Sequence, residues 1–159
     1  MTARAGIGYD IHRRAEGRPL VLGGVRFESP WGLAGHSDAD VLCHAIGDAL
    51  LGAASLGDLG DHFPPGDPRW RDASSLDLLA RIAALLRGRG ARIVNVDAMV
   101  VAEEPRLAPA RAAMLANLAR SLGIDSSQVS VKATTHEGLG AIGRGEGIAA
   151  WAVAMVETL

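Results

Sequence analysis

The sequence has one cysteine, few aromatic residues and no long apolar run, and each shortage excludes a class of protein. Cys43 is the only cysteine, which excludes an internal disulfide and a Cys-x-x-Cys metal site and favours a reducing compartment. Aromatic residues make up 4% of the chain, so a base-stacking surface for nucleic acid is not expected. The longest apolar run, residues 148–156, is shorter than the roughly 20 residues that span a bilayer.

Charge and composition are those of a globular domain without an excess of either sign. Hydrophobic residues make up 48% and charged residues 21%, and the formal net charge is -2, which offers no basic field for nucleic acid. The first residues lack the apolar segment of a secretory signal peptide. A length of 159 residues suits one domain with a substantial core. We therefore expect a single cytoplasmic domain over residues 1–159, with neither nucleic acid nor a membrane as a partner.

A segment that begins at His36 combines ionisable residues with a helical pattern. Ser37 is a suitable N-cap, and Asp40 stands at the third position of a capping box. In the helix that follows, Asp40, His44 and Asp48 are each four residues apart and share one face. The free N–H groups of its first turn, beside His36, would form an anion site. The alternative is a capped amphipathic helix whose acidic residues face water.

The N-terminal segment predicts a strand over residues 4–12. Asp10 and His12 are two residues apart in it and project from the same face. A carboxylate and an imidazole side by side at a strand end would form half of a metal site. A chance Asp-x-His pair in a loop is the alternative.

Apolar periodicity, together with Gly and Pro, predicts the other elements. Residues 20–27 predict a hairpin with a Gly-Gly turn, and residues 29–35 a loop. The Gly, Pro and Asp content of residues 57–68 predicts a long functional loop without regular structure. The remaining expected elements are a helix from Ser74 or Ser75 to Gly88, a helix over 107–122, and strands over 92–101, 129–135 and about 145–156. Their order predicts an α+β fold, a mixed β-sheet with helices packed on one face.

The segment between the last two predicted strands, residues 132–147, gathers glycines, hydroxyls and charges. Thr134, Thr135 and Arg144 suit phosphate, and Glu137 could hold a hard cation between phosphate oxygens. A glycine-rich hairpin is the alternative.

Six sequence blocks, in order, run through nearly the whole chain. They read Gly-Tyr-Asp-Ile-His at 8–12, Gly-His-Ser-Asp-Ala-Asp-Val at 35–41 with His44, Asp-Ala-Leu-Leu-Gly-Ala-Ala at 48–54, Gly-Asp-Leu-Gly at 57–60, Val-Lys-Ala-Thr-Thr at 131–135 and Gly-Arg-Gly-Glu-Gly at 143–147. In this combination the chain resembles the 2-C-methyl-D-erythritol 2,4-cyclodiphosphate synthases of the non-mevalonate isoprenoid pathway. The resemblance implies a phosphorus–oxygen lyase acting on 4-diphosphocytidyl-2-C-methyl-D-erythritol 2-phosphate. The 2-phosphate would attack the β-phosphorus, closing a cyclic diphosphate and releasing CMP.

The resemblance also implies two metal ions. Asp10, His12 and His44 match the zinc ligands of the family, which leave a fourth position for a phosphate oxygen. The same ligands could hold another divalent transition metal. Glu137 matches the carboxylate that holds Mg2+ or Mn2+ between the α- and β-phosphates. Asp48, one turn beyond His44, could orient the ring of His44 through a hydrogen bond.

The other matched positions contact substrate or line a cavity. His36 and Thr135 match residues that steady the transferring phosphoryl group, and we expect them to be catalytic. The expected substrate and nucleotide contacts are Ser37, Asp58, Gly60, Phe63, Asp67, Ala102, Pro105, Arg106, Leu107, Ala108, Ala133, Thr134 and Arg144. Family members are homotrimers with active sites between subunits, and residues 148–156 would help to bury the trimer centre. Arg144 and Glu146 match positions that line a central cavity able to hold an isoprenoid diphosphate.

Two positions depart from the family pattern. The loop that usually reads Phe-Pro-Asp-Thr-Asp is Phe-Pro-Pro-Gly-Asp at 63–67, and so lacks one carboxylate facing the erythritol hydroxyls. Ala141 stands where an aromatic residue is often found. Two other functions stay open at this point, a metal-dependent phosphohydrolase and a non-enzymatic trimer that binds isoprenoid diphosphates. Proximity of the internal phosphate favours cyclisation over hydrolysis. A fused cytidylyltransferase domain, known in the family, is not expected at this length.

Overall fold

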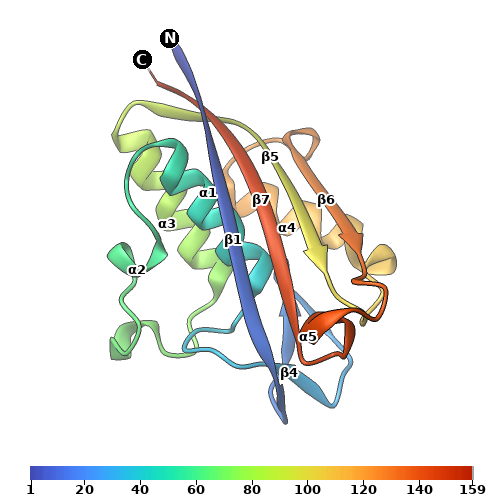
Figure 1. Ribbon diagram of the computed structural model, residues 1–159. Coiled ribbons are helices and arrows are strands. Elements are labelled where there is room, and N and C mark those ends of the chain that lie inside the picture. The colour runs from blue at the N-terminus through green and yellow to red at the C-terminus, as the bar shows by residue number, and fades with distance from the viewer. Residues whose placement is uncertain (159) are drawn as a thin grey trace.

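The strands nearest the two ends of the chain form the centre of the sheet. In the computed structural model, which describes residues 1–158, β1 (Thr2–Glu16) pairs antiparallel with β7 (Gly147–Thr158) over almost its whole length. The two termini therefore lie together at one end of the molecule (Figure 1). β1 extends beyond the predicted strand over 4–12 because β7 and the short β4 (Trp31–Leu33) provide backbone partners as far as Glu16. β4 lies in the segment predicted to be a loop.

The main sheet has the strand order β4-β1-β7-β5-β6. β5 (Ala91–Val101) is antiparallel to β7, and β6 (Val129–Thr134) runs parallel to β5. The predicted mixed sheet is therefore confirmed. β5 lies between the last two strands of the chain, β6 and β7, a position that the sequence did not predict. The glycine-rich segment is accordingly a crossover that contains α5 (Gly140–Gly143), and the hairpin alternative fails.

Three helices cover one face of the sheet, as predicted. α1 (Val41–Ala53), α3 (Ser75–Gly88) and α4 (Arg111–Leu122) lie behind the strands in Figure 1. The core between them and the sheet includes the fully buried Leu42, Ile46, Leu50, Leu79, Ile82, Leu86, Met114 and Leu118. α4 begins four residues later than predicted, because residues 108–110 form a 3-10 turn that contains Pro109.

Glycines allow α1 to lie directly on β1. A Cβ atom at Gly6 would be 2.1 Å from the carbonyl oxygen of Ala49, and one at Gly8 would be 1.8 Å from that of Ala45. Any larger residue at these two positions would push the helix away from the strand. The distance between α1 and β1 matters because both elements contribute to the site described below.

The start of α1 differs from its prediction. Its N-cap is Asp40, since Ala39 adopts a left-handed conformation with φ of 58° and holds the preceding residues outside the helix. The Asp40 carboxylate accepts from the backbone N–H of Cys43 and from those of Gly23 and Gly24. Asp40 therefore does not share a face with His44. The buried carboxylate of Asp40 also binds the first turn of α1, where the sequence predicted a site for a bound anion.

The hairpin that Asp40 holds is the one predicted from the Gly-Gly pair. β2 (Leu20–Leu22) and β3 (Val25–Phe27) are joined by Gly23 and Gly24, whose φ angles of 57° and 70° suit a two-residue turn. The later loop is less irregular than predicted. α2 (Leu59–His62) forms within residues 57–68, because Asp58 and Asp61 form a capping box around it.

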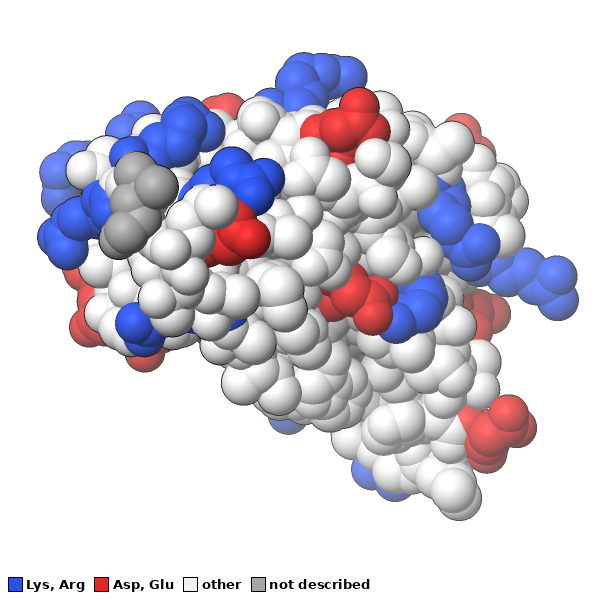
Figure 2. Space-filling model, turned by 90° about the horizontal axis from the view of Figure 1, so that it is seen from above, with Lys and Arg blue, Asp and Glu red and all other residues white. Residues whose placement is uncertain are grey.

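The opposite face of the sheet lies open, and its part on β1 and β7 is apolar, whereas β5 and β6 carry the ion pair of Asp97 and Lys132 there. The exposed large apolar residues on β1 and β7 are Ile7, Tyr9, Ile11, Trp151, Val153 and Met155. Figure 2 views the molecule from the end that carries the termini, and the side belonging to this face, along the lower margin, is largely uncharged. Within residues 1–158, no helix has the length and apolar character that crossing a membrane would require.

Candidate active site

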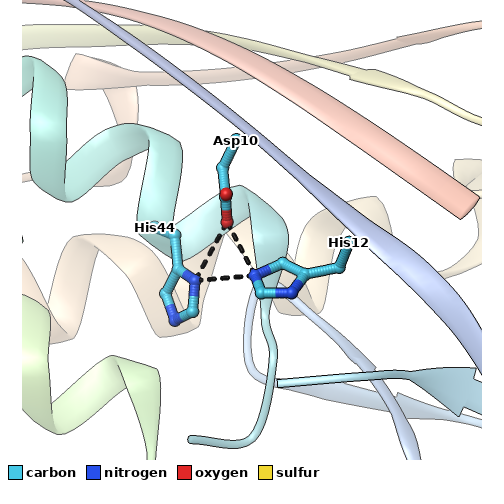
Figure 3. A group of neighbouring side chains, drawn as sticks. All are labelled: Asp10, His12 and His44. Carbon is cyan, nitrogen blue, oxygen red and sulfur yellow. Dashed lines mark hydrogen bonds and ion pairs between the residues drawn. The ribbon is translucent and has the colours of Figure 1, made fainter. Parts of the chain in front are cut away.

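Three side chains from β1 and α1 converge on one point (Figure 3). Asp10 Oδ2 lies 2.8 Å from His12 Nε2 and 3.0 Å from His44 Nδ1, and the two ring nitrogens are 3.1 Å apart. Strand alternation places Asp10 and His12 on the helix-covered face, and the close packing of α1 on β1 brings His44 to them. Among residues 1–158 these are the only three residues of metal-ligand type found grouped in this way.

The hydrogen bonds of His12 show what this cluster can bind. His12 Nδ1 lies 2.6 Å from the carbonyl oxygen of Ala34, which can only accept, so Nδ1 carries a proton. In the neutral ring, His12 Nε2 then faces Asp10 with a lone pair. In a tetrahedral zinc site with bonds of about 2.0–2.1 Å, ligand atoms are about 3.3–3.4 Å apart. The three residues therefore fit a small divalent ion after an outward shift of a few tenths of an ångström.

The charges of the cluster also favour a cation at its centre. Burial alone raises the pKa of Asp10, but hydrogen bonds and charge interactions with His12 and His44 outweigh burial and lower it to about 2. Burial lowers the pKa of His12, but the hydrogen bond and the charge of Asp10 outweigh this effect and raise that pKa above its usual value. A proton and a metal ion would therefore compete for the same place.

The cluster lies in one wall of a cavity, and apolar side chains form much of the rest. The cavity is lined by Asp10, His12, His36, Ser37, His44, Asp48, Leu59, Gly60, Phe63, Pro65, Trp70 and Leu78. It therefore brings together His36, Ser37, Gly60 and Phe63 with the predicted zinc ligands. The sequence interpretation had not included Trp70, whose ring packs edge-on against Phe63 with centroids 5.0 Å apart.

His36 connects the cavity to the loop after α2. Its Nε2 donates to the carbonyl oxygen of Asp67 over 2.9 Å, and its own carbonyl oxygen accepts from Asp72 N–H. The Asp67 carboxylate is bound by Arg69, whose hydrogen bonds lower the pKa of Asp67. Asp67 is not among the residues that line the cavity, and contact between its side chain and substrate stays a prediction.

Comparison with known proteins places the chain in a family. A model of the YgbB family matches residues 3–157. The chain belongs to the YgbB family. It is 60% identical over 158 residues to a protein of Thermosynechococcus vestitus named 2-C-methyl-D-erythritol 2,4-cyclodiphosphate synthase, covering 99% of this chain and 98% of that protein.

Solved structures of YgbB-like proteins have the same fold. The structure of a Plasmodium falciparum IspF in complex with CDP matches with a TM-score of 0.85 and 35% identity, over 98% of this chain and 96% of that one. The bifunctional IspDF of Campylobacter jejuni matches with a TM-score of 0.95 and 40% identity over 99% of this chain. This chain spans only 43% of that bifunctional protein.

Asp48 lies in the same cavity as His44 but does not form the hydrogen bond to its ring that the sequence suggested. Its Oδ1 accepts from Leu59 N–H at 2.8 Å, and within the described residues no hydrogen bond joins it to His44. Burial raises the pKa of Asp48. The His44 ring instead has Ser37 and Ser75 as neighbours. Sequence spacing could not identify Ser75, which lies 31 positions away on α3.

The other predicted site residues of this YgbB chain lie apart from the cavity. Asp10 pairs with Ala150, Ala150 with Val100, and Val100 with Ala133 in successive strands. Ala133 is thus three strands from Asp10, or about 14 Å at about 4.8 Å per strand. None of the following predicted residues lines the cavity, and they end or follow β5 and β6: Ala102, Pro105, Arg106, Leu107, Ala108, Ala133, Thr134, Thr135 and Glu137. One chain therefore carries two separate groups of predicted site residues.

Three more predicted residues lie at the margins of these groups. Asp58 caps α2, and its carboxylate accepts from Asp61 N–H. Arg144 and Glu146, just before β7, form an exposed ion pair with 2.6 Å between Nε and Oε1. Neither of these two lines the metal-type cavity.

Proposed function

We propose that the chain converts 4-diphosphocytidyl-2-C-methyl-D-erythritol 2-phosphate into 2-C-methyl-D-erythritol 2,4-cyclodiphosphate and releases CMP. The observation that carries this proposal is the convergence of Asp10, His12 and His44 in a partly apolar cavity. It occurs in a chain that is 60% identical to a synthase of that name over nearly its whole length. The CDP in the Plasmodium falciparum IspF complex supports a CDP-linked substrate.

The chemistry needs little from the protein beyond positioning and charge. The attacking 2-phosphate is already an anion, so the reaction requires neither a serine or cysteine nucleophile nor a strong base. The protein must bring two anionic groups together and stabilise charge on the transferring phosphoryl group. Expulsion of CMP from the β-phosphorus, with closure of the ring in the same molecule, makes the enzyme a phosphorus–oxygen lyase.

We assign zinc to Asp10, His12 and His44. When bound there, it would supply positive charge that polarises a phosphate oxygen. His36, at the rim of the same cavity, would steady the transferring phosphoryl group, and Ser37 would lie beside it. The apolar wall formed by Leu59, Phe63 and Trp70 would exclude water from the methylerythritol part of the substrate.

We assign the second metal and the cytosine to the other group of residues, and the ribose to residues at the start of α2 beside the cavity. Glu137 has an exposed side chain, and Thr135 Oγ1 accepts from Glu137 N–H at 3.1 Å. One carboxylate binds Mg2+ or Mn2+ when phosphate oxygens supply further ligands. Residues 102–108 with Ala133 and Thr134 would read the cytosine through backbone groups, and Asp58 and Gly60 would hold the ribose.

A homotrimer would complete the site by placing the second group of one subunit beside the cavity of the next. The separation of about 14 Å within one chain supports this arrangement, because one phosphoryl group must contact both groups. The open apolar face of β1 and β7 supports it too, since a surface of this kind is typical of an interface. Arg144 and Glu146 would then line a central cavity for an isoprenoid diphosphate. A single buried cysteine fits the cytoplasm.

A phosphorus NMR time course with the diphosphocytidyl substrate, zinc and magnesium tests the proposal. We expect CMP to appear together with the two phosphorus signals of a cyclic diphosphate. CMP accompanied by linear phosphates would instead identify a phosphohydrolase. No turnover by a folded, metal-loaded protein would favour a binding function. A sample treated with a metal chelator provides the control and should stay unchanged.

A further inference from the structure

The ring of His44 is held on the side away from the proposed metal by a buried serine. Ser75, the first residue of α3, is 1% exposed, and its Oγ lies 3.0 Å from His44 Nε2. The same hydroxyl is hydrogen-bonded to Asp38 Oδ1. Asp38 belongs to the segment before α1, so the three residues join the start of one helix to the interior of another.

The direction of these hydrogen bonds follows from counting protons. The Asp38 carboxylate accepts from Ser75 N–H at 2.9 Å and from Asp40 N–H at 3.1 Å, so its oxygens act as hydrogen-bond acceptors. The single hydroxyl proton of Ser75 is therefore donated to Asp38. Only lone pairs of Ser75 Oγ remain for His44, so a hydrogen bond between Ser75 Oγ and His44 Nε2 requires the proton on Nε2.

The direction of the hydrogen bond between Ser75 and His44 matters because Ser37 could place the ring proton of His44 on the other nitrogen. Ser37 Oγ lies 3.1 Å from His44 Nε2 and accepts from Ala39 N–H, so its own proton could be donated to Nε2. That would move the ring proton to Nδ1, which faces Asp10 at 3.0 Å. A proton on Nδ1 would occupy the direction in which a metal must bind.

We propose that Asp38 and Ser75 are positioning residues that fix the Nε2–H tautomer of His44 and so present Nδ1 to the metal. The proposal rests on the zinc assignment made for the proposed function. It extends that assignment to a chain of hydrogen bonds from Asp38 through Ser75 to His44. Partners of this kind affect metal affinity by about 10–100-fold in other proteins.

Ser75→Ala tests the proposal because it removes the hydroxyl and keeps the backbone N–H that Asp38 binds. We expect zinc affinity, measured by competition with a chromophoric chelator, to fall by about 10–100-fold. Ser74→Ala is the matched control. Ser74 is the adjacent exposed serine, and its side chain makes no capping hydrogen bond, so its removal should leave zinc affinity unchanged.

A second measurement reads the tautomer directly and does not depend on a variant that folds. In the metal-free wild-type protein at alkaline pH, nitrogen-15 NMR of His44 should show a protonated Nε2 and an unprotonated Nδ1. In Ser75→Ala, the population with a protonated Nδ1 should rise. A protonated Nδ1 in the wild type would overturn the proposal, as would equal zinc affinity and the same tautomer in both proteins.

The two proposals fail in different ways. If the wild-type protein binds no zinc through Asp10, His12 and His44, the zinc assignment is wrong, and the tautomer measurement still decides the hydrogen-bond direction. If the wild type binds zinc tightly and Ser75→Ala binds it equally, the zinc assignment stands and the positioning role of Ser75 is rejected.

Discussion

The two histidines of the cluster present different ring nitrogens to its centre. His12, on a strand, uses Nε2 while its Nδ1 is held by the Ala34 carbonyl oxygen. His44, on a helix, uses Nδ1 while its Nε2 is held by Ser75. Each ring is thus fixed at its remote nitrogen, which restricts rotation and directs the other nitrogen to Asp10. This arrangement is typical of histidines that bind metals.

His44→Ala removes one of the three converging groups. We expect zinc affinity to fall by more than the roughly 100-fold that loss of an outer partner causes, and turnover to be lost. The fold should persist, because the ring lies at the edge of a cavity. Zinc content and circular dichroism measure the two effects. His62→Ala is the control, since the His62 ring donates to the Leu56 carbonyl oxygen and does not line the cavity. Full zinc content in His44→Ala would refute the ligand assignment.

The raised pKa of His12 predicts opposite pH dependences with and without zinc. In the metal-free protein, the stability from protonated His12 is fully present below its unfolded pKa of 6.5 and is lost as pH rises through the higher folded pKa. Zinc competes with that proton, so zinc affinity should increase over the same range. The pKa of Asp10, at about 2, keeps its carboxylate charged throughout. Melting temperatures of both forms from about pH 6 to about pH 9 test this. Parallel curves would contradict it.

At the residue scale, short sequence spacings predicted part of the site. Strand alternation paired Asp10 with His12, and these two side chains do converge. Helical spacing also grouped Asp40 and Asp48 with His44, but Asp40 is drawn to the N–H groups of Gly23 and Gly24 and Asp48 to that of Leu59. In both cases backbone N–H groups of other segments determine where the carboxylate points. The spacing of residues in the sequence carries no information about those donors.

At the scale of elements, the contact between α1 and β1 determines whether the cluster can form. Asp10 and His12 are fixed to the strand and His44 to the helix, so the distance between the two backbones sets the distance between the ligand atoms. Gly6 and Gly8 permit α1 to lie so close to β1 that a side chain at either position would overlap the helix backbone. The glycines are therefore part of the metal-type site, although neither lines the cavity.

Gly8→Ala should damage both the fold and the cluster. The new Cβ would lie 1.8 Å from the Ala45 carbonyl oxygen, so α1 must move. We expect a loss of about 3 kcal/mol of unfolding free energy, measured with denaturant, and a parallel loss of zinc affinity as His44 moves away from Asp10. Gly88→Ala is the matched control. Its Cβ would meet no atom within 4 Å at the end of α3, so stability should rise by up to about 1 kcal/mol. Unchanged zinc affinity in Gly8→Ala would show that the helix position is not limiting.

The elements themselves were predictable where they are long and periodic. β5 and α3 begin within a residue or two of their predicted starts, because each carries a continuous apolar pattern. β4 was not predicted because three residues are too few to show an alternating apolar pattern, and the strand is defined by its pairing with β1. The insertion of β5 between β6 and β7 was also missed, since strand order is a tertiary property. The sequence thus predicted the layers of the fold more reliably than its connections.

At the scale of the whole molecule, one chain has an exposed apolar surface and two separate groups of predicted site residues. The apolar residues on the open face of β1 and β7 would destabilise a monomer in water relative to an assembly that buries them. Asp10 of one group of predicted site residues and Ala133 of the other lie about 14 Å apart. Assembly through the open face would address both features. The metal-type cluster differs, because all three of its residues belong to one chain.

Val153→Glu separates assembly from metal binding. Val153 is 50% exposed on the open face of β7, and a carboxylate there would be buried without a partner in a trimer. We expect the mass measured by light scattering to fall to about one third of the wild-type value and turnover to be lost. Zinc affinity should stay close to that of the wild type, since Asp10, His12 and His44 are all supplied in one chain.

Ala116→Glu, which adds the same charge to the exposed side of α4, is the control and should remain trimeric and active. A trimeric, active Val153→Glu would place the interface elsewhere, and a monomeric but active wild type would reject a site shared between subunits.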